Sequence, residues 1–181
     1  MQMDNHYFIG IKIPLPTARS LVEQRDSWNL SSHKRLPVAE DLHITLLFIG
    51  GDPHGEIGEV AKALEEVEHE PFTVDITGTG YFGKKERPRV VYAATKENDS
   101  LNRLQRKIKD TLKGFQLSPD NKPFVPHITL ANKWAAREPW NDIPELDTER
   151  FEADEFTLFR IEPAQTPRYI AVQTYKLKDG V

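Results

Sequence analysis

Apolar residues recur along the chain at two spacings, every second residue in some segments and every third or fourth residue in others. Period two is typical of half-buried strands, and spacings of three and four are typical of amphipathic helices. The pattern predicts strands over Tyr7–Ile13, Leu42–Ile49, Phe72–Thr79, Arg89–Thr95, His127–Ala131, Phe151–Ile161 and Tyr169–Leu177. It predicts helices over Thr17–Trp28, Gly55–Glu68 and a segment through Leu112 that Asp99 or Ser100 can cap. Strands and helices therefore alternate in two roughly equivalent halves, which indicates an α+β protein with internal pseudo-symmetry.

One tetrapeptide, His-Ile-Thr-Leu, occurs at His43–Leu46 and again at His127–Leu130, once in each half. In a strand, the histidine and threonine of each copy share one face, and the isoleucine and leucine share the other. The apolar face of the first copy is expected to continue to Phe48. Two such His/Thr faces turned toward each other would form a cleft with two imidazoles and two hydroxyl groups.

Composition is that of a globular protein: 181 residues, 38% hydrophobic and 29% charged. This length fits one domain over residues 1–181, or two small lobes that share a core. The chain has no cysteine, so disulfides and a thiol nucleophile are excluded. No signal-peptide pattern opens the chain and no apolar run approaches about 18 residues. We therefore expect a cytoplasmic protein that does not enter a membrane. We also expect the protein to be a monomer.

Charge limits the nucleic acids that this protein could bind. The formal net charge is −4 and the isoelectric point is near 5.9. Proteins that bind long nucleic acids through the backbone usually carry an excess of basic residues. Any contact with nucleic acid must therefore be local, to an RNA end or a small nucleotide and not to a long duplex. The basic stretch Lys84–Arg89 is interpreted as a solvated loop.

Two histidines in one cleft can divide the work of acid–base catalysis. Because the ordinary histidine pKa is near 6.5, one ring can be neutral and the other protonated at neutral pH. The neutral ring would activate a nucleophile, and the protonated ring would protonate the leaving oxygen. Hydroxyl groups of Thr45 and Thr129 could donate to a phosphoryl oxygen. This set suits cleavage of a cyclic phosphodiester without a metal, although the residues alone do not assign which of His43 and His127 is the acid.

Other interpretations compete with this one. A single copy of the tetrapeptide would more often be an ordinary half-buried strand, but a copy in each half favours function. A zinc site lacks His-x-His and His-Glu-x-x-His spacing, and only Asp41 lies close in sequence to either histidine. The remaining histidines are expected at the surface: His6, His33, His54 and His69.

Several segments together resemble the two-histidine (2H) phosphoesterases, and within that family the RNA 2′,3′-cyclic phosphodiesterases, historically called 2′-5′ RNA ligases. The similar segments are Tyr7–Ile11, Arg35–Gly50, Gly80–Gly83 with Arg87–Val91, Phe124–Ala131, and Arg168 with Tyr169. The chain departs from the family where a basic residue usually follows Ala131, because Asn132 stands there and Lys133 comes one position later.

The resemblance implies a bilobal, pseudo-twofold fold in which two antiparallel-rich sheets line a central cleft and helices lie outside. It implies metal-independent hydrolysis of a terminal 2′,3′-cyclic phosphate to a 2′-phosphomonoester, with no cofactor. By position, His43 would be the proton donor, His127 the proton acceptor, and Thr45 and Thr129 would hold the phosphate. Substrate contacts would come from Arg35, Phe82, Phe124, Arg168 and Tyr169.

Two alternatives stay open from the sequence. A 2H enzyme could act on another cyclic phosphate or a 2′,5′-linked nucleotide, such as ADP-ribose 1″,2″-cyclic phosphate, or could catalyse 2′-5′ RNA ligation. A module that binds RNA ends without turnover is the other alternative.

Overall fold

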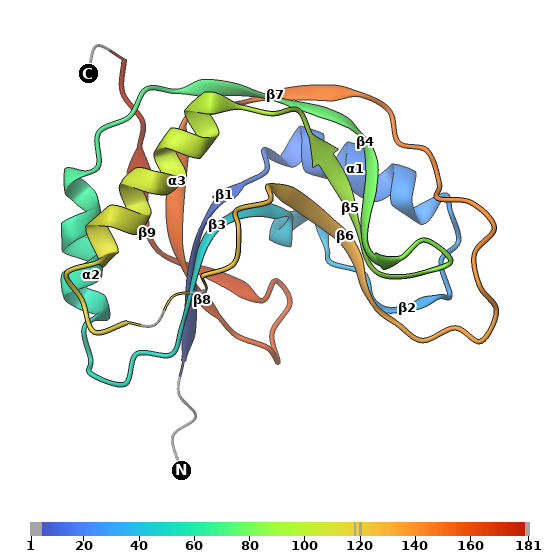
Figure 1. The fold of residues 1–181 in the computed structure, drawn as a ribbon, viewed down its shortest axis with the longest axis horizontal. Helices are drawn as coiled ribbons and strands as arrows, with labels where there is room; N and C mark the ends of the chain where they lie inside the picture. Colours follow the sequence, from blue (N-terminus) through green and yellow to red (C-terminus); the bar gives the residue numbers. More distant parts are fainter. Residues whose placement is uncertain (1–4, 118, 120, 180–181) are drawn as a thin grey trace.

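The computed structural model describes residues 5–117, 119 and 121–179, and within these residues the strands form a single nine-stranded antiparallel sheet (Figure 1). Its strands are β1 (His6–Lys12), β2 (His33–Arg35), β3 (His43–Gly50), β4 (Phe72–Lys84), β5 (Arg87–Thr95), β6 (His127–Trp134), β7 (Glu149–Ala153), β8 (Glu155–Ile161) and β9 (Tyr169–Lys176). The helices are α1 (Leu15–Asp26), α2 (Ile57–Ala63) and α3 (Asp99–Leu112), with short 3₁₀ turns η1 (Ala39–Asp41) and η2 (Leu64–Glu66). These elements confirm the α+β class.

The order of strands in the sheet is β7-β4-β5-β6-β3-β1-β8-β9, with β2 paired to β6. Strands β6 and β3, which carry the two tetrapeptides, meet at the centre through the antiparallel pair Ile44 and Ile128. Each half repeats one unit, in which a strand, a helix and a second strand antiparallel to the first follow in order. The units are β1-α1-β3, with β2 and η1 between α1 and β3, and β5-α3-β6. The two expected sheets are therefore the two halves of one continuous sheet, joined by a short central contact.

Helices cover the apolar face of the sheet in a crossed manner. Helix α3, which belongs to the unit of β6, packs against β3, and α1, which belongs to the unit of β3, packs against β6 (Figure 1). Ile44 and Ile128 are both fully buried beneath these helices. The opposite face of the two strands carries the histidines and threonines, which are half-buried.

A β-bulge interrupts each tetrapeptide strand at the same place. Gly10 pairs with Thr45 and Ile9 with Leu47, so Leu46 is an extra residue on β3. A bulge turns two successive side chains to the same side and shifts the alternation that follows. The prediction for Phe48 was therefore wrong, because it lies on the His/Thr face with 41% of its surface exposed.

The second strand repeats this irregularity. Tyr92 pairs with Thr129 and Val91 with Ala131, so Leu130 is the extra residue on β6. Leu130 and Ala131 are both fully buried, as are Leu46 and Leu47 to within a few per cent. Both tetrapeptides therefore end in a bulge directly after the threonine.

Other boundaries differ from the sequence expectations for local reasons. The predicted strand Phe151–Ile161 is two strands, because the chain leaves β4 at Ala153 and then pairs with β9 from Glu155 and with β1 from Thr157. Strand β2 lies in a polar stretch that was not expected to form a strand, and it is too short to show a period. Asn98 caps α3, not Asp99 or Ser100, since its side chain accepts from the N–H of Leu101 at 3.0 Å. Among the described residues, no helix has both the length and the apolar character needed to cross a bilayer.

Candidate active site

The central register of the sheet brings the two tetrapeptides together. Because Ile44 and Ile128 face each other in antiparallel strands, His43 lies across from Thr129, and Thr45 lies across from His127. Alternation along each strand turns these four side chains to the face opposite the buried isoleucines. Two imidazoles and two hydroxyl groups therefore share one surface at the middle of the sheet.

Both imidazoles are held in the same orientation by their own main chain. Nδ1 of His43 lies 2.7 Å from the carbonyl oxygen of Asp41, and Nδ1 of His127 lies 2.7 Å from that of Val125. A carbonyl oxygen can only accept, so Nδ1 carries the hydrogen in both rings. In a neutral ring the lone pair is then on Nε2. Each histidine can therefore use Nε2 as a base when neutral, or as an acid when protonated.

His43 occupies an aromatic surrounding that disfavours its charge. Its ring centroid lies 4.7 Å from Phe8 and 4.9 Å from Tyr169, and its Nε2 is 3.0 Å from Oγ1 of Thr45. Burial lowers the pKa of His43 from its ordinary 6.5 to about 4, and the positive charge of His127 adds to this shift. The carbonyl of Asp41 opposes the shift, because it stabilises the protonated ring.

His127 has a similar but distinct aromatic surrounding. Its ring centroid lies 4.9 Å from Phe82, in an edge-on contact, and 5.3 Å from Tyr92. Burial lowers the pKa of His127 as well, and the carbonyl of Val125 opposes that shift. The neutral form of each histidine is therefore favoured in the unliganded protein.

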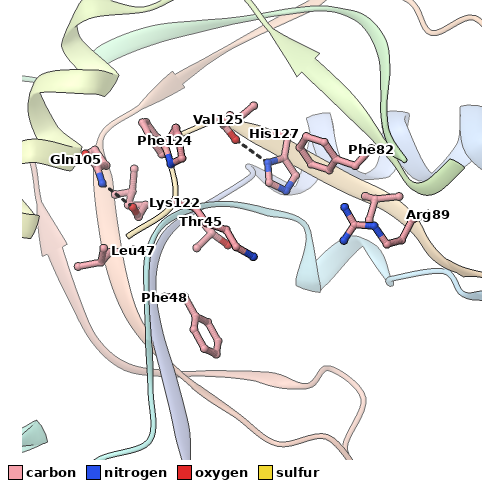
Figure 2. Close-up of a pocket in the computed structure, with 13 residues that line it drawn as sticks. Thr45, Leu47, Phe48, Phe82, Arg89, Gln105, Lys122, Phe124, Val125 and His127 are labelled. Atoms are coloured by element: carbon pink, nitrogen blue, oxygen red, sulfur yellow. Dashed lines mark hydrogen bonds between the residues drawn. The ribbon is translucent and has the colours of Figure 1, made fainter. Parts of the chain in front are cut away.

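A cleft of ≈ 560 Å³ opens beside His127 and Thr45 (Figure 2). Three phenylalanines form much of its wall: Phe48, Phe82 and Phe124. Arg89 and Lys122 add positive charge to the same cleft. Aromatic walls suit a nucleobase, and cationic side chains suit a phosphate, so the cleft is chemically suited to a nucleotide.

Comparison with known proteins places the chain in a family. Residues 14–164 match the family model described as the 2′-5′ RNA ligase superfamily. The chain belongs to this superfamily. Among curated relatives, the RNA 2′,3′-cyclic phosphodiesterase of Bacillus subtilis is 30% identical over 178 residues, which are 95% of this chain and 96% of that protein. The enzyme of the same name from Geobacillus stearothermophilus is 32% identical over 96% of this chain, but the chain spans only 57% of that relative's length.

Solved structures of similar proteins agree with the fold. Escherichia coli LigT in complex with 3′-AMP superposes with a TM-score of 0.84 at 21% identity, over 98% of this chain and all of that one. A protein of Thermus thermophilus superposes with a TM-score of 0.80 at 27% identity, over 97% of this chain and 100% of that one. These similarities support the superfamily fold for this sheet and its helices.

The substrate contacts expected for a superfamily member fall into two groups. Phe82 and Phe124 line the cleft. Arg35, Arg168 and Tyr169 lie on the His43 side: Nη2 of Arg35 donates to the hydroxyl of Tyr169 at 2.9 Å, and the Arg168 guanidinium lies 5.9 Å from the Tyr169 ring centre.

Asn132, where the resemblance led us to expect a basic residue, lies beside a cationic residue of the neighbouring strand. Arg35 on β2 pairs with Asn132 on β6. A cationic residue therefore lies across from Asn132 on the neighbouring strand. Lys133 is exposed and has a left-handed backbone conformation, with φ of 64°.

Two further cleft residues do not follow from the sequence pattern. Alternation assigns Phe48 to the apolar face, and the basic stretch assigns Arg89 to a solvated loop, yet both line the cleft. No periodic signal marks a bulge, so Phe48 could not have been placed correctly. Arg89 sits near the start of a hairpin strand, where sequence does not give the direction of the side chain.

Two of the histidines expected at the surface are buried. His33 is 6% exposed, donates from Nε2 to the carbonyl of Pro88 at 2.7 Å and contacts the hydroxyl of Ser32. His69 is 1% exposed, and Nζ of Lys107 donates to its Nδ1 at 3.0 Å. His6 and His54 are exposed as predicted. Within the described part of the chain, no group of three or more His, Asp or Glu side chains is arranged to hold a metal ion.

Proposed function

We propose that this chain is an RNA 2′,3′-cyclic phosphodiesterase, which hydrolyses a terminal cyclic phosphate to a 2′-phosphomonoester by paired-histidine acid–base catalysis without a metal. The proposal rests on the central register between β3 and β6. This register supports a site in which two imidazoles and two hydroxyl groups lie on one surface beside a cleft. The names of the Bacillus subtilis and Geobacillus stearothermophilus relatives support the same activity.

In the proposed reaction, the acid and base roles of the two histidines are assigned as the resemblance to the 2H phosphoesterases implies. Nε2 of His127 takes a proton from a water molecule, and the water oxygen forms a bond to phosphorus. The bond between phosphorus and the 3′ oxygen breaks, and Nε2 of His43 gives its proton to that oxygen. Thr45 and Thr129 donate to the non-bridging oxygens, where negative charge grows in the transition state. The products are a 2′-phosphomonoester and a free 3′ hydroxyl group. His127 gains one proton in the reaction and His43 loses one.

The acid role of His43 requires the substrate. Because burial holds its pKa at about 4, His43 is neutral in the unliganded protein at pH 7. A cyclic phosphate carries a negative charge, and an anion close to an imidazole favours the protonated form. We infer that binding of the phosphate charges His43, so that acid and base are set only when substrate is present.

The proposal extends to the setting of the enzyme. It acts as a cytoplasmic monomer on RNA 3′ ends or small cyclic nucleotides, and residues 1–181 form one catalytic domain of two pseudo-symmetric lobes. The 3′-AMP held by Escherichia coli LigT supports a nucleotide as ligand.

An end-product assay on a short oligoribonucleotide with a 2′,3′-cyclic terminus tests the function. We expect a 2′-phosphate product, activity unchanged by EDTA, and a loss of several orders of magnitude in kcat for His43→Ala and for His127→Ala. His54→Ala removes an exposed histidine and serves as the matched control. Full activity in either site variant, or loss of activity in EDTA, would contradict the proposal.

A further inference from the structure

Each bulge that ends a tetrapeptide is held by a buried polar side chain from a helix. Nε2 of Gln105 on α3 donates to the carbonyl oxygen of Leu46 at 3.3 Å, as the dashed line in Figure 2 shows. Nη1 of Arg25 on α1 donates to the carbonyl oxygen of Leu130 at 3.1 Å. Leu46 and Leu130 are the extra residues of the two bulges, directly after Thr45 and Thr129.

Both contacts are made inside the protein. Arg25 is 4% exposed and Gln105 is 9% exposed, among the few polar or charged residues that the fold buries. A bulge takes its extra residue out of the regular ladder of hydrogen bonds, and a buried carbonyl without a donor is costly. Each side chain therefore supplies a hydrogen-bond donor to the carbonyl oxygen of a bulge residue, which lies outside the regular pairing with the neighbouring strand.

The two contacts cross between the halves of the sheet. Gln105 comes from the unit that contains His127, but it holds the strand of His43. Arg25 comes from the unit that contains His43, but it holds the strand of His127. Arg25 also donates from Nη1 to the carbonyl oxygen of Pro37, in the segment that leads to the first tetrapeptide. Each contact therefore links the motif strand of one half to the helix of the other half.

We propose that Arg25 and Gln105 are positioning residues that set the distance and angle between His43 and His127. This inference rests on the proposed function, because it assigns their effect to the two-histidine reaction. A displacement of about 1 Å in a reacting group can cost on the order of 100-fold in rate. Since the central pair of β3 and β6 is short, the crossed contacts from the helices supply the constraint that a longer ladder would give.

The variants Gln105→Met and Arg25→Lys remove or shorten these donors while keeping most of the side-chain volume. We expect kcat to fall roughly 10- to 100-fold in both variants. KM is expected to change less than about 3-fold in Arg25→Lys, because Arg25 is not among the residues that line the cleft, whereas Gln105 also lines it. Tyr175→Phe is the matched control, since it removes another buried hydrogen bond to a main-chain carbonyl, from the Tyr175 hydroxyl to Ala61 at 2.6 Å, on a different helix. An equal loss of kcat in Tyr175→Phe would overturn the proposal.

Imidazole ¹⁵N NMR of the unliganded protein separates positioning from substrate contact and from general loss of stability. Gln105→Met is expected to move the signals of His43 and to leave those of His127 in place, whereas Arg25→Lys is expected to move those of His127. Unchanged histidine signals, or equal shifts of both histidines in Gln105→Met, would overturn the inference. Because this measurement needs no turnover, it gives its result even if the cyclic-phosphate assay fails. If Arg25→Lys does not fold, Gln105→Met alone decides.

Discussion

The main-chain carbonyl of Asp41 accepts a hydrogen bond from Nδ1 of His43 at 2.7 Å, and this contact fixes the tautomer of the ring. The carboxylate of the same residue, which is 5% exposed, accepts from the main-chain N–H of Arg168 at 3.0 Å and of Tyr169 at 3.3 Å. Tyr169 in turn packs edge-on against the His43 ring. One aspartate therefore orients the imidazole from two directions, through its own main chain and through the start of β9.

Asp41→Ala should lower both stability and kcat. Loss of the carboxylate leaves two main-chain N–H groups of Arg168 and Tyr169 without their acceptor, which costs about 1–3 kcal/mol in the free energy of unfolding. The loosened Tyr169 no longer fixes the His43 ring, so kcat falls. Urea unfolding and steady-state kinetics measure the two effects.

Asp52→Ala is the matched control for Asp41→Ala. The Asp52 carboxylate also accepts from two main-chain N–H groups, those of Glu56 and Ile57, at 2.8 and 3.0 Å, but it does so at the start of α2. A similar loss of stability with unchanged kcat is expected there. If both variants lose kcat equally, Asp41 has no particular relation to His43.

Stability should depend on pH through His43. Its pKa is lowered by burial from 6.5 to about 4, so between these values the unfolded chain binds a proton that the folded protein does not. The free energy of unfolding therefore rises with pH across this window. The contribution of His43 to that free energy is lost as pH falls from about 6.5 toward 4. His43→Gln should flatten this part of the curve, measured by urea unfolding at a series of pH values. An unchanged slope in the variant would show that other groups, such as His33 and His69, carry the effect.

Activity should depend on pH differently in the free and bound enzyme. If bound phosphate charges His43, the pKa of that ring is higher in the complex than in the unliganded protein, where it is about 4. The limb on which activity falls with rising pH reports the acid, so it should lie at higher pH for kcat than for kcat/KM. Coincident limbs would contradict the charging of His43 by the substrate.

The sequence was sufficient where a feature depends on local pattern. Alternation placed His43 and Thr45 on one face of a strand, and the second tetrapeptide repeated this arrangement. The sharing of one surface by the two faces follows from the pairing of Ile44 with Ile128 and not from the order of residues. The repeat also predicted the pseudo-symmetry, which the sheet expresses as two equivalent units.

The sequence was insufficient where a feature depends on pairing between distant segments. The bulge at Leu46 moved Phe48 into the cleft, and nothing in the order of residues marks where a strand gains an extra residue. Asp154 separates β7 from β8, where the chain changes its partner strands from β4 to β1 and β9. The order of residues shows only a shift in the apolar alternation at this point, from Ala153 to Phe156, and does not identify the new partners. The helical pattern places Gln105 and Arg25 on helices but gives them no further role, since their acceptors lie far away in the chain.

Gly80→Ala should impair His127 through Tyr92. A methyl group on Gly80 would lie 2.3 Å from the Tyr92 ring, too close for any real contact, so the ring must move. Tyr92 contacts both His127 and Phe82, with ring centroids 5.3 and 4.6 Å away. We expect kcat to fall about 10-fold or more. Gly58→Ala is the control, because a methyl group there meets nothing within 4 Å and should leave kcat unchanged.

Phe48→Ala should weaken substrate binding while leaving the chemistry intact. The side chain lines the cleft, and 41% of its surface is exposed. Its ring is paired with that of His6, and among the described ring contacts it is paired with neither His43 nor His127. Stacking of a base on an aromatic side chain is worth about 1–3 kcal/mol, so we expect KM for a cyclic-ended oligoribonucleotide to rise roughly 5- to 100-fold. Since the reacting groups are untouched, kcat should change less than about 3-fold. Val172→Ala removes a similarly exposed apolar side chain, 42% accessible, from β9 and provides the comparison. Equal KM values for Phe48→Ala and Val172→Ala would show that the base does not stack on Phe48.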